Sequence, residues 1–177
     1  MKSRKQLKFW KDPDTVHGGT HRAKKRKVTR TIVTKSPMHV TFKSSRAREE
    51  WSFTRFDGAI EEKIYSLARR YRVRVRLYQN VGNHLHLVTQ AASRREFQSF
   101  LRVVPQAVAF LVTGTRKGRA IGKFWDGLVH TRVVFWGKDW FNLKGYLGRN
   151  RFEAAGAPRD VVDRWFKEAR SAWYRAA

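Results

Sequence analysis

The 177-residue chain has no cysteine, few acidic residues and no long apolar run. Without cysteine it can form neither disulfides nor thiolate metal sites, which fits a reducing compartment. No apolar stretch approaches the ~20 residues of a membrane-spanning helix, so we expect no membrane partner. The N-terminal residues are charged and lack the apolar centre of a signal peptide, so we expect no export. These absences favour a cytoplasmic protein.

The shortage of acidic residues leaves a large excess of positive charge. Lys and Arg number 39 against 14 Asp and Glu, for a formal net charge of +25. Such an excess repels itself unless a polyanion offsets it, so nucleic acid is the favoured partner. The aromatic content is 14%, and Arg beside aromatic residues suits single-stranded nucleic acid, whose bases stack. The alternative is that most of these aromatic side chains belong to the core.

Much of the positive charge lies in the first part of the chain. Residues 1–36 contain twelve Lys and Arg against Asp12 and Asp14, and show no apolar periodicity. We predict a basic arm that is flexible when free and contacts phosphates when engaged. The alternative is a solvated tail with no site of its own. Residues 37–177 are predicted to form one domain that ends in a helix.

Hydrophobic periodicity predicts four strands interleaved with helices. The strands are expected at 38–43, 73–77, 84–90 and 131–135, and the helices at 57–71, 93–111, 139–149 and 160–173. Asp57 is the expected N-cap of the first helix, and Ser93 with Glu96 forms a capping box for the second. The order β-α-β-β-α-β-α-α predicts an α+β fold with a ferredoxin-like, RRM-like antiparallel sheet and packed helices.

Two histidines lie one residue apart in the hexapeptide 83–88, Asn-His-Leu-His-Leu-Val. Because alternate side chains of a strand share a face, His84 and His86 should project together while Leu85 and Leu87 enter the core. Two adjacent imidazoles are the beginning of a metal site. The alternative is two polar residues on a solvated strand face.

The preceding strand of the predicted hairpin adds charge to this face. If its apolar residues face the same helices as Leu85 and Leu87, then Arg74, Arg76 and Tyr78 share the face of the histidines. Nearby positive charge would lower the pKa of the imidazoles, keep them neutral for metal ligation and attract a phosphate.

A second segment offers a nucleophile. Tyr146 and Asn150 lie four residues apart, so a helix would present both on one face. A phenol oxygen can act as a nucleophile, and an amide oxygen can be a neutral metal ligand. The alternative is that Tyr146 is an ordinary core or surface aromatic residue. Tyr78 is the second candidate nucleophile.

The hexapeptide resembles the His-hydrophobic-His motif of the single-tyrosine endonuclease transposases, and most closely that of the REP-associated tyrosine transposases. Further segments resemble the family in order, namely the opening strand 37–42, the Trp-containing loop 124–126, the fourth strand 131–134 and the nucleophile helix 145–156. Together the pieces extend from about residue 17 to residue 156. Two sites depart from the family pattern. Val81-Gly82 replaces a common Met-Pro, and Asn150-Arg151 replaces a common Asn-Pro.

The resemblance implies a metal-dependent enzyme that cleaves single-stranded DNA at or near hairpins. Tyr146 would attack the scissile phosphate, forming a 5′-phosphotyrosine and freeing a 3′-hydroxyl. His84 and His86 would hold a divalent cation, Mg or Mn, with Asn150 as the third ligand. The cation would polarise and orient the phosphate. Because the exchange conserves phosphodiester energy, the strands could be rejoined without ATP.

The implied partner is single-stranded or hairpin DNA, bound in a bacterial cytoplasm in association with the nucleoid. The expected DNA contacts are basic residues of the arm, the hairpin and a loop, namely Lys24, Lys25, Arg26, Lys27, Arg74, Arg76, Arg116, Lys117 and Arg119. Relatives act as monomers or as dimers with shared sites, so both a monomer and a homodimer are compatible with the sequence. Two alternatives are also open: a non-catalytic nucleic-acid-binding protein of the same fold, and a domesticated descendant of such a transposase.

Overall fold

The computed structural model describes residues 15–19, 29–115 and 122–175, with side chains as far as residue 167. Its strands are β1 (Val16–His17), β2 (Met38–Lys43), β3 (Val73–Asn80), β4 (His84–Ala91) and β5 (His130–Val133). Its helices are α1 (Asp57–Arg70), α2 (Arg94–Thr113), α3 (Lys138–Ala154) and α4 (Arg159–Arg175), with 3-10 turns η2 (Glu49–Trp51) and η3 (Phe53–Phe56). The described strands form one antiparallel sheet in the order β1-β5-β2-β4-β3. The predicted α+β, ferredoxin-like fold is confirmed.

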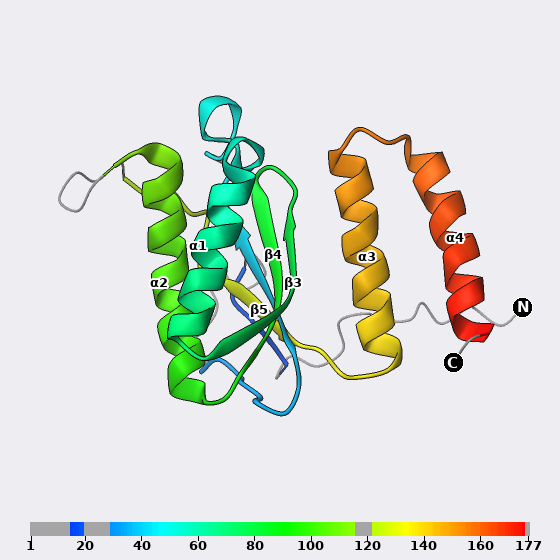
Figure 1. The fold of residues 1–177 in the computed structure, drawn as a ribbon, viewed down its shortest axis with the longest axis horizontal. Helices are drawn as coiled ribbons and strands as arrows, with labels where there is room; N and C mark the ends of the chain where they lie inside the picture. Colours follow the sequence, from blue (N-terminus) through cyan, green and yellow to red (C-terminus); the bar gives the residue numbers. More distant parts are fainter. Residues whose placement is uncertain (1–14, 20–28, 116–121, 176–177) are drawn as a thin grey trace, which may run out of the picture.

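The helices lie on both faces of the sheet. Helices α1 and α2 cover one face, whereas α3 lies on the other and α4 packs on the outer side of α3 (Figure 1). The main core lies between the sheet and α1 and α2, and includes Leu85 and Leu87 of β4. A smaller cluster joins the opposite face to α3, and consists of Val88, Val134, Leu143 and Leu147. The alternation predicted for β4 is therefore confirmed.

Strand β3 departs from the predicted alternation. Its register against β4 shifts between Val75 and Leu77, so Arg76 is an extra residue at a bulge. Beyond the bulge the side chains exchange faces. Leu77 packs with the α3 cluster, whereas Tyr78 packs against the main core and its hydroxyl donates to Asp57 at 2.7 Å. The prediction that Tyr78 shares the face of the two histidines is wrong for this reason.

The two predicted helix starts have different outcomes. The Oγ of Ser93 accepts a hydrogen bond from the backbone N–H of Glu96, so the N-cap of α2 is confirmed. Helix α1 instead has Phe56 at its N-cap position, and Asp57 is its first residue. The carboxylate of Asp57 accepts hydrogen bonds from side chains of β3, which ties the start of α1 to the sheet.

Strand β1 lies within the segment predicted as the basic arm. It pairs with β5 and is followed by Gly18, whose φ is +77°. A Cβ at this position would collide with the carbonyl oxygen of Val129, so the close approach requires glycine. Ile32 and Val33 pack against the main core. Residues 1–14 and 20–28 of the predicted arm lie outside the described residues.

Helix α3 is joined to the sheet by polar contacts at both ends of its buried stripe. The buried guanidinium of Arg132 donates to both carboxylate oxygens of Asp139, at 2.9 and 2.8 Å. Asp139 also accepts from the backbone N–H of Phe135 at 2.9 Å. Farther along α3, the Gln79 side chain of β3 donates to the carbonyl oxygen of Leu147. These contacts fix the position of α3 over the face of β4 that carries Val88.

Candidate active site

The imidazole rings of His84 and His86 lie side by side on β4. Their planes differ by 1° and their centroids are 6.0 Å apart. His84 is half-buried and His86 is buried, on the face of the sheet opposite the main core. The two histidines therefore project from the same face of β4, as predicted, and this is the face on which α3 lies.

Helix α3 of the same chain brings Tyr146 to this pair. The phenol ring meets the His86 ring edge-on, with centroids 6.3 Å apart and planes at 87°. Tyr146 is 49% exposed, so solvent reaches this side chain. Asn150 lies one turn farther along α3 and is partly buried. One chain thus places the predicted nucleophile beside the predicted ligands.

Burial keeps both imidazoles uncharged. Burial is the largest of three causes, with the charges of His84 and His130, that together lower the pKa of His86 to about 4. Burial is also the main cause that lowers the pKa of His84, followed by the charge of Lys43, which pairs with it in the sheet. Neutral imidazole is the form that binds a metal ion.

Sequence reasoning named a different cause for these pKa shifts. It attributed the low pKa of the histidines to Arg74 and Arg76, but neither residue contributes to the shift of His84 or His86. That part of the prediction is wrong. The cation that acts on His84 is Lys43, at the end of β2, and Asp126 opposes its effect.

Strand β2 supplies a polar layer beneath the pair that sequence reasoning missed. The Nε2 of His39 lies 3.2 Å from the Nδ1 of His86, and the Thr41 hydroxyl lies 3.3 Å from the same atom. His39 is 4% exposed. The only sequence signal was the alternation of residues 38–43, which puts positions 39 and 41 on one face. The Nδ1 of His84, the first residue of β4, forms a hydrogen bond with the Oδ1 of the preceding residue, Asn83.

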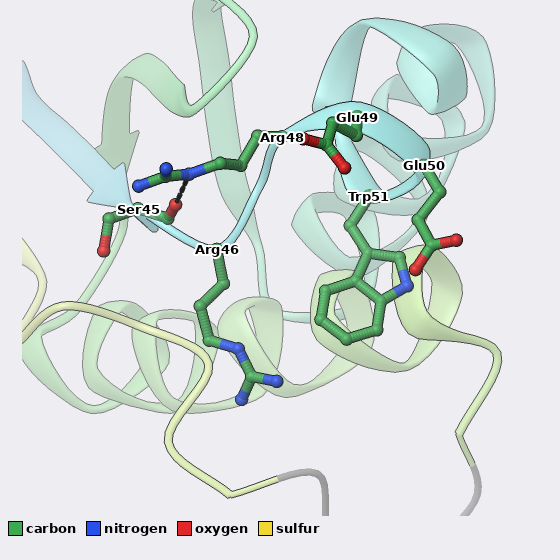
Figure 2. Close-up of a pocket in the computed structure, with 6 residues that line it drawn as sticks. All are labelled: Ser45, Arg46, Arg48, Glu49, Glu50 and Trp51. Atoms are coloured by element: carbon green, nitrogen blue, oxygen red, sulfur yellow. Dashed lines mark hydrogen bonds between the residues drawn. The ribbon is translucent and has the colours of Figure 1, made fainter.

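A pocket opens where the chain leaves β2, at the end of the sheet where Lys43 pairs with His84. Figure 2 shows the residues that line it: Ser45, Arg46, Arg48, Glu49, Glu50 and Trp51. The Arg46 guanidinium lies over the Trp51 ring, 5.1 Å from its centroid. The Arg48 Nε donates to the carbonyl oxygen of Ser45 at 2.6 Å. Sequence reasoning did not single out this basic and aromatic segment.

The predicted DNA contacts are only partly within the described structure. Arg74 is exposed on β3. Arg76 donates to the Gln90 side chain at 2.6 and 3.1 Å, and lies 5.0 Å from the centroid of the half-exposed Trp136 ring. Arg76 therefore lies near the residues that precede α3. The other predicted contacts lie outside the described residues, namely Lys24, Lys25, Arg26, Lys27, Arg116, Lys117 and Arg119.

The described residues contain no group of three or more His, Cys, Asp or Glu side chains placed to hold a metal ion. A cation at the histidine pair would therefore take its remaining ligands from an amide, from phosphate or from water. Two neutral imidazoles with their Nδ1 atoms already hydrogen-bonded fit a divalent cation as a partial donor set.

Comparisons with known proteins bear on the fold. No family model matches the chain, and a search of curated proteins finds no significant match. A solved structure of a REP-associated tyrosine transposase bound to a REP hairpin is similar, with a TM-score of 0.59 and 13% sequence identity. The match covers 72% of this chain and 73% of that one. This chain therefore has the fold of a REP-associated tyrosine transposase, as its motifs predict.

Proposed function

We propose that the chain is a metal-dependent endonuclease and transposase that cleaves and rejoins single-stranded DNA near hairpins. The observation that carries the proposal is the contact of Tyr146 with His86, 6.3 Å between ring centroids, within a single chain. The similar transposase structure contains a hairpin, which supports hairpin DNA as the substrate. The net charge of +25 supports a polyanionic partner.

In the proposed reaction, the phenol oxygen of Tyr146 attacks the scissile phosphorus. The new bond joins phosphorus to this oxygen, the bond to the 3′-oxygen breaks, and the phenol proton is lost as the 3′-hydroxyl gains one. The number of phosphoester bonds does not change, so the reverse reaction can rejoin strands without ATP. The half-exposed position of Tyr146 leaves its hydroxyl accessible to a strand.

Tyr78 is a poorer nucleophile than Tyr146. It lies against the main core on the opposite face of the sheet from the histidines, and its hydroxyl donates to Asp57. Burial and the Asp57 carboxylate raise its pKa above the ordinary value, which disfavours the reactive phenolate.

His84 and His86 are the proposed ligands of a divalent cation, Mg or Mn, and Asn150 is the proposed third ligand. When bound, such a cation supplies Lewis acidity that polarises a phosphate oxygen. The protein contributes two neutral imidazoles held parallel on a rigid strand. Exposed Arg74, with Arg76 beside Trp136, is proposed to bind the DNA backbone on the same side of the sheet.

The proposal is tested with single-stranded oligonucleotides that carry a hairpin and randomised flanks, incubated with the protein and Mn²⁺. The wild type should nick them. The double variant His84→Ala, His86→Ala should bind the same DNA with salt-sensitive affinity and should not cleave it, because the metal ligands are gone. Circular dichroism of this variant checks that it is folded.

Full cleavage by the folded double variant would contradict the proposal that His84 and His86 bind the catalytic cation. DNA binding by the wild type without cleavage, in Mn²⁺ and in Mg²⁺ alike, would instead support a non-catalytic nucleic-acid-binding protein of the same fold.

A further inference from the structure

Each of the two candidate histidine ligands already has one ring nitrogen in contact with another polar group of the protein. The Nδ1 of His84 lies 2.5 Å from the Oδ1 of Asn83. Because an amide oxygen only accepts hydrogen bonds, this Nδ1 must carry the ring proton. The lone pair of a neutral His84 then lies on Nε2.

The Nδ1 of His86 is engaged from the neighbouring strand. It lies 3.2 Å from the Nε2 of His39 and 3.3 Å from the Thr41 hydroxyl. The rings of His39 and His86 stack with centroids 5.3 Å apart. Since the two nitrogens lie on different edges of an imidazole, an Nδ1 turned toward β2 leaves Nε2 turned away from it.

His39 has no evident structural reason to be a histidine. It is 4% exposed, and within the described residues its Nδ1 has no hydrogen-bond partner. An unsatisfied buried nitrogen is costly and calls for an explanation. Its other nitrogen suggests a role, because Nε2 lies 3.2 Å from the Nδ1 of His86, and one of these two nitrogens must donate to the other.

We propose that His39 and Asn83 are positioning residues that hold His86 and His84 as Nδ1–H tautomers, so that both Nε2 atoms are available to one divalent cation. The inference rests on the proposed function. The partners of the two histidines differ: the amide of Asn83 holds His84, and the imidazole of His39 holds His86. Both partners have the same effect, which is to keep the ring proton on Nδ1. An Nε2–H tautomer of either His84 or His86 would place a proton where the cation binds.

The tautomers can be measured without metal or DNA, by long-range ¹H–¹⁵N correlation spectra of the free protein. His84 and His86 should both show the Nδ1–H pattern. In His39→Met, which keeps length but removes the acceptor, His86 should shift toward Nε2–H while His84 is unchanged. An Nε2–H pattern for wild-type His86, or an unchanged His86 in the variant, would overturn the proposal.

Affinity for Mn²⁺ alone, measured by calorimetry, provides the second readout. His39→Gln places an amide oxygen near the former Nε2, so it should bind Mn²⁺ nearly as well as the wild type. His39→Met should bind about 10- to 100-fold more weakly. Equal losses in both variants would mean that His39 is only a packing residue.

Asn83 allows the same comparison without risk to the core, because it is exposed. Asn83→Asp keeps an acceptor oxygen beside His84 and should retain Mn²⁺ affinity, whereas Asn83→Leu should lose it. Equal affinities in the two variants would refute a positioning role for Asn83. If the wild type shows the predicted tautomers but binds no Mn²⁺, the proposed function fails while the tautomer assignment stands.

Discussion

His86 combines deep burial with a ring that must stay neutral, and this links the candidate site to stability. Its pKa is lowered to about 4, whereas an unfolded histidine titrates near 6.5. As the pH falls below about 6.5, the unfolded state therefore takes up a proton that the folded state does not. Stability contributed by neutral His86 is fully present above that pH and is lost as the pH falls toward 4.

The His86→Gln variant should consequently lose less stability in acid than the wild type. Between pH 7 and pH 4.5 the difference in unfolding free energy should be on the order of 2 kcal/mol. Urea unfolding at a series of pH values measures it. His84→Gln is the control, since His84 is only half-buried and should give a smaller effect in the same direction. Parallel curves for wild type and His86→Gln would contradict the assignment of a buried neutral ring.

Local patterns predict some site residues and not others. Strand alternation places His84 beside His86, and helical spacing places Tyr146 one turn from Asn150. The role of His39 depends on the register between β2 and β4, which joins positions 47 residues apart in the chain. Tyr78 was placed on the wrong face because the bulge at Arg76 has no local sequence signal.

Helix α3 carries the proposed nucleophile, and α4 supports it from outside. Gly148 lets the two helices approach closely, because a Cβ there would lie 2.8 Å from the Cζ of Phe166. Beside this contact, Arg149 pairs with Asp163 at 3.2 Å. The position of Tyr146 over β4 thus depends on sheet contacts on one side of α3 and on α4 on the other.

Gly148→Ala should test this packing. Alanine favours a helix over glycine by about 1 kcal/mol, but here its methyl group must displace the Phe166 ring, at a cost of about 1–3 kcal/mol. We expect net destabilisation in urea unfolding. Gly145→Ala is the matched control, since nothing lies within 4 Å of its Cβ and it should stabilise the protein. Equal stabilisation by both substitutions would show that α4 does not pack on α3 in solution.

Element ends were harder to predict than element order. Helix α3 runs from Lys138 to Ala154, beyond the predicted 139–149, because its later turns pack against α4. Strand β1 went unpredicted, since two residues carry no alternation and their pairing depends on β5.

The complete chain combines an ordinary core with an unusual charge. The order of strands and helices was enough to predict the ferredoxin-like sheet, because few topologies satisfy it. The two faces of the sheet then have separate tasks. Helices α1 and α2 cover one face and α3 the other (Figure 1). The first face holds the main core, and the second carries the histidine pair. None of the described helices is long and apolar enough to cross a membrane.

The central claim is that Tyr146 becomes covalently joined to a DNA 5′-phosphate, and peptide mass spectrometry after incubation with hairpin DNA and Mn²⁺ tests it most directly. The account predicts a nucleotide adduct on the Tyr146 peptide of the wild type and of the control Tyr65→Phe. Tyr146→Phe should bind the same DNA and give none. An adduct on another tyrosine, or none from folded, DNA-bound wild type, would contradict it.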